Sequence, residues 1–219
     1  FAEMGMVQET DREHPCSGCP GRKAGLLDLA DSSPCVLGVL ITRWNVQVAL
    51  SDLRARILRL EQRDYAPDMS EMALLKMMLD GIDAVCCGFD RRILGVGLAA
   101  MGPVSKERGT ILSPSNFFGL HDVPVVEAVH AHTGLPVFVA SEIMAEAQSE
   151  KLLGEGRSHS NFLFLLIHEG IGCGVIINDR PYTGARGLGG EMGHTSIDLN
   201  GPKCPCGSCG CLELYASTD

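Results

Sequence analysis

The chain has 219 residues, of which 45% are hydrophobic, and this is enough to bury one sizeable core or two smaller ones. Its 27 acidic residues exceed its 18 basic residues, and the formal net charge of -9 argues against a chain that binds nucleic acid over its own surface. No apolar run reaches the roughly 18 residues that a transmembrane helix needs, and the first residues lack the pattern of a secretory signal.

Residues 1–33 are rich in proline and glycine, and we interpret them as a turn-rich linker region. They contain a lone Cys-x-x-Cys, formed by Cys16 and Cys19, with His14 nearby. A metal site needs a second pair of ligands, so we interpret this segment as a variable loop.

The rest of the chain alternates between strand and helix patterns. Continuous or alternating apolar runs predict strands over residues 36–41, 46–50, 56–60, 93–98, 136–140, 162–167 and 174–178. Apolar residues at helical spacing predict helices over residues 70–80, 124–133 and 143–153. Ser70 is the predicted N-cap of the first helix and Gly81 is its predicted end, whereas the second helix is predicted to end at Gly134. Strands followed by alternating helices and strands indicate an α/β fold.

The last part of the chain concentrates residues that bind soft metals. His194, Cys204, Cys206 and Cys211 have a spacing that can close tetrahedrally on one Zn²⁺. The glycines at 207 and 210 let the chain fold back over the metal without a side-chain clash. The sequence therefore predicts a structural zinc site.

These cysteines allow two other interpretations. They can pack as small apolar residues, whereas a disulfide framework is disfavoured because neighbours in Cys-x-Cys point apart. Cys209 is a fifth candidate ligand, which we leave out because the two glycines frame Cys206 and Cys211. The remaining cysteines lie mostly in apolar contexts that suit free thiols in a reducing compartment, so we expect a cytoplasmic protein.

The segment Glu-Met-Gly-His at 191–194, followed by Cys-x-Cys-Gly-x-x-Gly-Cys-x-Glu at 204–213, resembles the signature of the ROK family of repressors, open reading frames and sugar kinases. Upstream, residues 171–184 resemble the family's glycine-rich hairpin, and residues 94–104 resemble its first-lobe strand and Pro-Gly turn. Residues 135–139 resemble the strand that leads to the catalytic aspartate. The match extends from about residue 21 to the end.

The resemblance implies an actin-like ATPase (ribonuclease-H-like) fold with two lobes, of which the second is incomplete. It assigns residues 1–33 to the wing and linker of a winged helix-turn-helix, 34–123 to the first lobe, and 124–219 to the start of the second lobe with its zinc loop. We expect the chain to lack most of the winged helix-turn-helix and the C-terminal part of the second lobe.

The segments that bind ATP phosphates in kinases of the family are altered here. A kinase hairpin reads roughly Gly-x-Asp-x-Gly-Gly-Thr, and Leu40 stands where the aspartate would hold Mg²⁺. Arg43 and Trp44 stand where glycines would let backbone N–H groups approach phosphate oxygens. We expect Trp44 to obstruct the phosphates, and we interpret Arg43 as a solvated turn residue.

Two further departures concern the catalytic step. Glu142 replaces the aspartate that takes the proton from the sugar hydroxyl, and its side chain is one methylene longer. In the second glycine loop, His168-Glu169-Gly170 replaces Gly-Thr-Gly, and a carboxylate there repels phosphates.

The residues that contact the sugar in the family are retained. The resemblance assigns sugar contacts to Glu191, His194 and Glu213, with Glu142 as a fourth. A carboxylate accepts two hydroxyl protons at once through charge-assisted hydrogen bonds. His194 is expected to use one ring nitrogen for zinc and the other for the sugar. Asn116 is a weaker candidate, which we interpret as a turn residue.

Together these features predict the effector-binding region of a sugar-responsive transcriptional regulator with structural Zn²⁺. We expect a sugar or sugar derivative as effector, DNA bound through the winged helix-turn-helix, and a homo-oligomer. The alternative is an ATP-dependent sugar kinase of the same family, similar to glucokinase or an N-acetylhexosamine kinase. A third interpretation is a zinc-stabilised protein-binding domain without a ligand.

Overall fold

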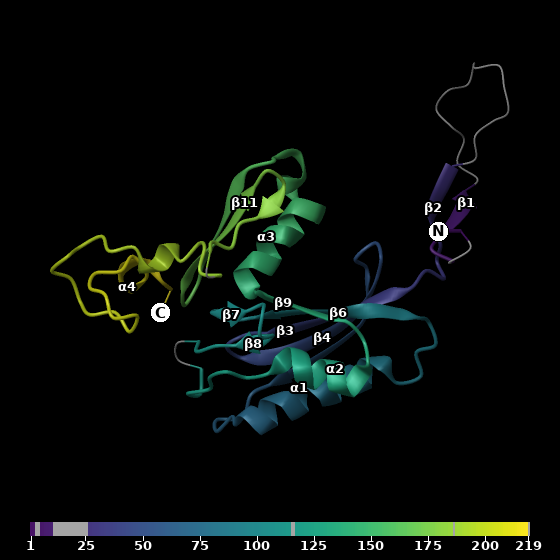
Figure 1. Cartoon of the computed structure of the whole chain (residues 1–219), viewed down its shortest axis with the longest axis horizontal. Helices are drawn as coiled ribbons and strands as arrows, with labels where there is room; N and C mark the ends of the chain where they lie inside the picture. The colour runs from purple at the N-terminus through teal and green to yellow at the C-terminus, as the bar shows by residue number, and fades with distance from the viewer. Residues whose placement is uncertain (3–4, 11–25, 115–116, 186, 219) are drawn as a thin grey trace, which may run out of the picture.

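The structure is a computed structural model that describes residues 1–2, 5–10, 26–114, 117–185 and 187–218 (Figure 1). The Cys-x-x-Cys of Cys16 and Cys19 and the weaker candidate Asn116 lie outside the described residues. Each strand and helix predicted above is present, with ends that differ by up to several residues.

A five-stranded mixed sheet with the order β5-β4-β3-β6-β9 forms the larger part of the molecule. Its first three strands are antiparallel: β3 (Cys35–Ile41), β4 (Asn45–Asp52) and β5 (Ile57–Asp64). Both β6 (Ile93–Ala100) and β9 (Val137–Ser141) run parallel to β3. The α/β fold class is therefore confirmed.

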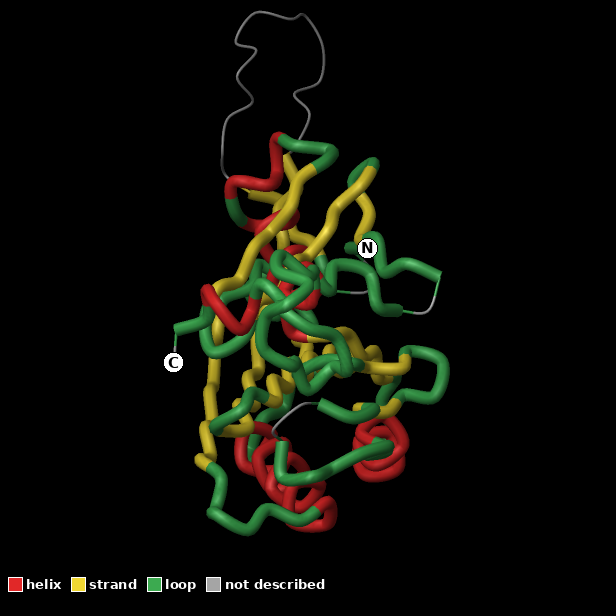
Figure 2. Tube along the Cα trace, turned by 90° about the vertical axis from the view of Figure 1, so that its left-hand side faces the viewer, coloured by secondary structure: helices red, strands yellow, loops and turns green. Residues whose placement is uncertain are grey.

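Helices α1 (Glu71–Cys86) and α2 (Val125–Thr133) cover one face of this sheet, as Figures 1 and 2 both show. Every second residue of β3 and β4 points into that layer and is buried, whereas the residues between them are partly exposed. Because this alternation has a period of two, the helices bury one face of the antiparallel pair and leave the other less covered.

The ends of the helices test the predicted caps. Ser70 is the N-cap of α1, and its hydroxyl accepts a hydrogen bond from the N–H of Ala73 at 3.2 Å, as predicted. The predicted end at Gly81 is wrong, because α1 continues to Cys86. A Cβ at Gly81 would lie 2.8 Å from a methyl group of Val48, so this glycine lets α1 approach β4 closely. Gly134 ends α2 in the left-handed conformation, as predicted.

Helix α3 (Glu142–Leu153) begins directly after β9 and leads to a second, smaller sheet. That sheet contains β10 (Phe162–Ile167), β11 (Ile171–Ile177) and β12 (Arg180–Pro181), all antiparallel. A side chain at Gly174 would collide with Ala147, so the glycine allows α3 to lie close to β11. The α2 and β9 elements, which the expected division at residue 124 assigns to the second lobe, belong to the layers of the five-stranded sheet.

The remaining elements are short. An antiparallel pair of β1 (Val7–Thr10) and β2 (Leu26–Leu29) stands apart from both sheets in Figure 1. A small hairpin of β7 (Val104–Ser105) and β8 (Thr110–Ile111) follows β6. The others are η1 (Glu155–Ser158), η2 (Met192–His194) and α4 (Glu213–Ala216). None of the helices in the described part of the chain combines the length and the apolar character that crossing a bilayer requires.

Candidate functional site

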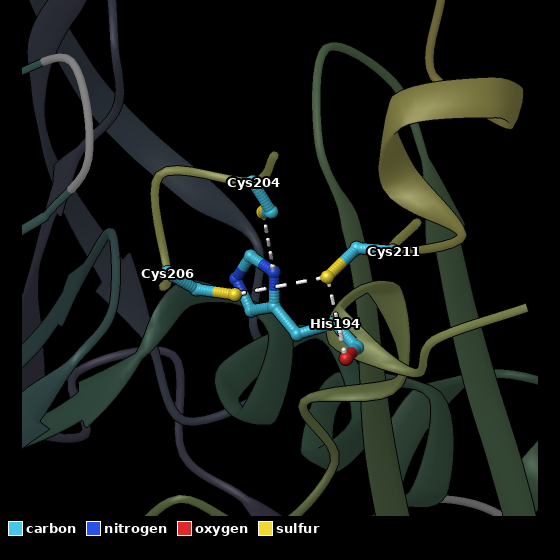
Figure 3. Close-up of side chains that lie close together, drawn as sticks. All are labelled: His194, Cys204, Cys206 and Cys211. Atoms are coloured by element: carbon cyan, nitrogen blue, oxygen red, sulfur yellow. Dashed lines mark hydrogen bonds between the residues drawn. The ribbon is translucent and has the colours of Figure 1, made fainter. Parts of the chain in front are cut away.

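The structure brings the four predicted metal ligands together after η2. One ligand atom from each of His194, Cys204, Cys206 and Cys211 lies within 4.8 Å of all the others. The sulfurs of Cys206 and Cys211 are 3.6 Å apart, and the Cys204 sulfur lies 3.7 Å from Nδ1 of His194 (Figure 3). Zinc bonds of about 2.0–2.3 Å in a tetrahedron separate neighbouring ligand atoms by about 3.3–3.8 Å, so this arrangement fits Zn²⁺.

The loop between the ligands is shaped by its glycines. Gly207 and Gly210 have φ values of 98° and 60°, which residues with a Cβ rarely adopt. The carbonyl of Gly210 accepts the N–H of Ile197 at 2.8 Å, so the loop folds back on the segment that follows η2. This close packing explains why His194 and the cysteines converge although nine residues separate His194 from Cys204.

Cys209 is outside the cluster of ligand atoms. Its backbone forms a bridge with Lys203, and its carbonyl accepts a hydrogen bond from the Ser196 hydroxyl at 2.6 Å. The predicted ligand set and the geometry therefore agree on leaving Cys209 out.

The cluster is partly buried. Cys204 and Cys211 are buried, His194 is half-buried and Cys206 is exposed. Burial, with the thiols of Cys204 and Cys206 beside it, raises the pKa of the Cys211 thiol. Metal binding here would therefore displace protons, because zinc takes cysteine as thiolate.

Glu213 connects the chain beside this cluster to β11, and His194 has one ring nitrogen that faces the cluster. Nδ1 is the ring nitrogen of His194 that faces Cys204, so Nε2 lies on the other side of the ring. An oxygen of Glu213 accepts the N–H of Ile171, the first residue of β11, at 2.9 Å. The same oxygen would be 3.2 Å from a Cβ at Gly170. Sequence reasoning assigned Glu213 to a sugar and missed this second contact, which fixes the carboxylate beside the β10–β11 turn.

Glu191 precedes η2, and its side chain is exposed. The preceding residue, Gly190, has a φ of 95°, and its carbonyl accepts the N–H of Cys173 at 3.1 Å. A side chain at Gly190 would collide with the Cys173 carbonyl. The backbone of Glu191 is therefore held against β11 while its carboxylate remains accessible.

Glu142 is the first residue of α3 and directly follows β9 of the five-stranded sheet. Burial raises its pKa and Glu146 raises it further, whereas Arg43 and His168 lower it. His168 belongs to the β10–β11 turn that Glu213 borders. Glu142 and Glu213 therefore both lie near this turn, one reaching it from the end of the five-stranded sheet and the other from the zinc loop.

A cavity of about 900 Å³ lies over the less covered face of the five-stranded sheet. Its floor is largely apolar and includes Leu40, Leu60 and Phe138. Glu142 and Glu146 line it from α3, and an oxygen of Glu146 is buried without a hydrogen-bond partner. Sequence reasoning did not select Glu146, because only the fold shows that it faces the same cavity one helical turn after Glu142.

The β3–β4 turn differs from expectation at Arg43. Arg43 is not a solvated turn residue: its side chain is 29% exposed and its Nε lies 3.6 Å from an oxygen of Glu169. Trp44 is 57% exposed, and the hydroxyl of Thr42 accepts the N–H groups of Trp44 and Asn45. The sequence singled out Arg43 and Glu169 separately, and only the fold brings them together.

Comparisons with known proteins agree on one family. The ROK family model matches residues 36–219. The xylose repressor of Bacillus spizizenii is 32% identical over 98% of this chain and 54% of its own length. The glucokinase of Thermotoga maritima is 31% identical over 83% of this chain and 57% of its own length. Most of this chain is matched by these curated relatives, but it spans only about half of their length.

A solved ROK family transcriptional regulator, described as a homologue of the Escherichia coli MLC protein, superposes with a TM-score of 0.82. It is 28% identical, and the match covers 99% of this chain and 54% of that one. The strand order, the mixed sheet and this superposition establish the actin-like ATPase fold. With the family model matching nearly all of the two sheets and the metal-ligand loop, the chain belongs to the ROK family.

Proposed function

We propose that this chain is the effector-binding region of a sugar-responsive transcriptional regulator. The observation that carries the proposal is Leu40, which lines the cavity next to Glu142 at the β3 position where the kinase motif has a carboxylate. A leucine cannot hold Mg²⁺, so the position supplies no ligand for the metal that phosphoryl transfer requires. Similarity to a xylose repressor over 98% of the chain supports the same proposal.

The zinc is proposed to be structural. His194, Cys204, Cys206 and Cys211 would hold it with no open position for a substrate, which is typical of structural zinc. By fixing His194 and the segment that ends at Glu213, the metal would orient the side chains that face the ligand.

The sugar is proposed to contact Glu142, Glu191, His194 and Glu213. Support comes from the accessible carboxylate of Glu191, the second ring nitrogen of His194 and the position of Glu142 and Glu213 on either side of the β10–β11 turn. A ligand held between side chains from two sheets would change their relative orientation, and a DNA-binding module would respond to that change. We further propose a homo-oligomer in the cytoplasm, where the free thiols of the described residues stay reduced.

The proposal is tested by calorimetry of the purified protein with D-xylose, D-glucose and N-acetyl-D-mannosamine. Glu191→Ala is expected to weaken binding of the sugar by about 1.5–3 kcal/mol, the range for hydrogen bonds to a charged group. Glu127→Ala, an exposed carboxylate on α2, is the matched control and should leave affinity unchanged. An affinity that Glu191→Ala leaves unchanged, with zinc content intact, would show that Glu191 does not contact the sugar, and absence of any sugar binding would favour the binding module without a ligand.

A sugar kinase is the second candidate, because Glu142 keeps a carboxylate whose pKa burial raises, as suits a general base. With Leu40 in β3, we expect no ATP-dependent phosphorylation of these sugars above background in the presence of Mg²⁺. A coupled assay that detects turnover of about 1 s⁻¹ or more would establish the kinase instead.

A further inference from the structure

Two turns from different sheets meet beside Glu142. The β3–β4 turn carries Arg43, and the β10–β11 turn carries His168 and Glu169. Arg43 and Glu169 form an ion pair at 3.6 Å, and their side chains are only 29% and 26% exposed. This partly buried pair joins the five-stranded sheet to the smaller sheet.

Three backbone donors at the β3–β4 turn are already used within the turn. The hydroxyl of Thr42 accepts the N–H of Trp44 and that of Asn45, each at 3.1 Å. The N–H of Thr42 in turn donates to the carbonyl of Asn45 at 3.0 Å. A backbone nest that binds an anion needs successive N–H groups that point at the ligand. Here the N–H groups of Trp44 and Asn45 point at the hydroxyl of Thr42, which occupies the position that an anion would take.

The charges around this junction are mostly negative. Burial raises the pKa of Glu142 and Glu146 raises it further, while Arg43 and His168 lower it. Glu213 borders the same β10–β11 turn. Since Glu169 balances the charge of Arg43, a phosphate group brought here would meet the carboxylates of Glu142 and Glu213.

We infer that the Arg43–Glu169 pair is an internal counter-ion that keeps anionic groups out of this junction, so that the sugar accepted beside Glu142 is an unphosphorylated one. The class of ligand rests on the function proposed above. The exclusion of anions rests on the ion pair and the closed turn, and it can be tested separately.

The first experiment compares each sugar with its phosphate by calorimetry. The probes are D-xylose, D-glucose and N-acetyl-D-mannosamine, with xylose 5-phosphate, glucose 6-phosphate and N-acetylmannosamine 6-phosphate. The sugar that binds is expected to do so more tightly than its phosphate, by on the order of tenfold or more. A phosphate that binds as well as its sugar, or better, would overturn the inference.

The second experiment removes the negative charge that pairs with Arg43, by the nearly isosteric substitution Glu169→Gln. Affinity for the sugar phosphate is expected to rise by on the order of tenfold, because the charge of Glu169 no longer balances that of Arg43. Adding Arg43→Gln in the same chain should remove the gain, and Glu127→Gln should not produce it. An unchanged ratio between sugar and phosphate in Glu169→Gln contradicts the inference.

A third probe, inorganic pyrophosphate, separates this inference from the proposed function. If none of the sugars binds, the proposed function fails, and pyrophosphate still reports on the junction. Glu169→Gln is expected to bind it about tenfold more tightly than the unaltered chain or the double variant. Thr42→Val, which frees the N–H groups of Trp44 and Asn45, is expected to act in the same direction and serves if Glu169→Gln does not fold. Equal pyrophosphate binding by every folded variant refutes the internal counter-ion.

Discussion

Gly81 lies in the middle of α1, where helix propensity disfavours glycine. Glycine fits at this position because it has no side chain: a Cβ there would be 2.8 Å from a methyl group of Val48. Glycine at 134 has the opposite role, since its φ of 69° ends α2. Sequence pattern alone gives the same prediction for both residues, and only packing against β4 distinguishes them.

Gly81→Leu is therefore expected to lower the free energy of unfolding by about 1–3 kcal/mol, the usual cost of inserting methylenes into a filled space. Chemical denaturation followed by circular dichroism measures the change. Ala84→Leu, at an exposed position of the same helix, should stay within about 0.5 kcal/mol of the unaltered chain. If Gly81→Leu were as stable as Ala84→Leu, the stability of α1 would not depend on the close approach of Gly81 to β4.

A second residue-scale prediction concerns Glu146. Burial raises its pKa above the ordinary value, and one of its oxygens has no hydrogen-bond partner. A carboxyl with a raised folded-state pKa binds more protons when folded, so its ionisation costs stability as pH rises from the unfolded-state pKa through the folded-state pKa. Glu146→Gln is expected to gain stability relative to the unaltered chain over that rise, from about pH 4 upward. Denaturation at pH 4 and at pH 7 measures it, and a difference that does not grow with pH contradicts the assignment.

At the scale of elements, α3 connects the two sheets. It begins at Glu142 without a loop after β9, so the end of a parallel strand and the first turn of a helix together present the carboxylate. Ligands of open α/β sheets bind beyond the carboxyl ends of parallel strands, and Glu142 occupies such a position. The other side of α3 packs on β11 through Gly174, which explains how one helix serves both sheets.

The zinc loop is the element with the sharpest prediction. The purified protein is expected to contain about one Zn²⁺ per chain and to lose it with acid or chelator, because its thiolates must be protonated or displaced. Cys211→Ser should lower the zinc content strongly, since it removes a buried ligand. Cys209→Ser is the matched control and should retain the metal. Elemental analysis decides, and zinc lost from the control but not from Cys211→Ser would reverse the ligand assignment.

At the scale of the whole molecule, the sequence predicted the order of strands and helices and the four converging ligands. Both depend on local information: apolar periodicity gives the elements, and short spacing gives the metal ligands. The Arg43–Glu169 pair, the bond from Glu213 to Ile171 and the cavity position of Glu146 could not be predicted this way. Each joins segments far apart in the chain, and their meeting depends on how the two sheets are arranged rather than on any local pattern.

The hydrogen bond between Glu213 and Ile171 affects how loss-of-function variants of this protein should be interpreted. Glu213 follows Cys211, the last proposed zinc ligand, by two residues, and Ile171 directly follows the turn that carries Glu169. We therefore expect damage to the proposed metal loop to disturb the β10–β11 turn through this carboxylate and through the bond from the N–H of Thr218 to the carbonyl of His168. Substitutions in the two places should combine non-additively in a double-mutant cycle, as expected for residues that share a partner. If the chain responds to a sugar as proposed, a genetic screen for variants that no longer respond should also recover substitutions of the proposed metal ligands Cys204, Cys206 and Cys211.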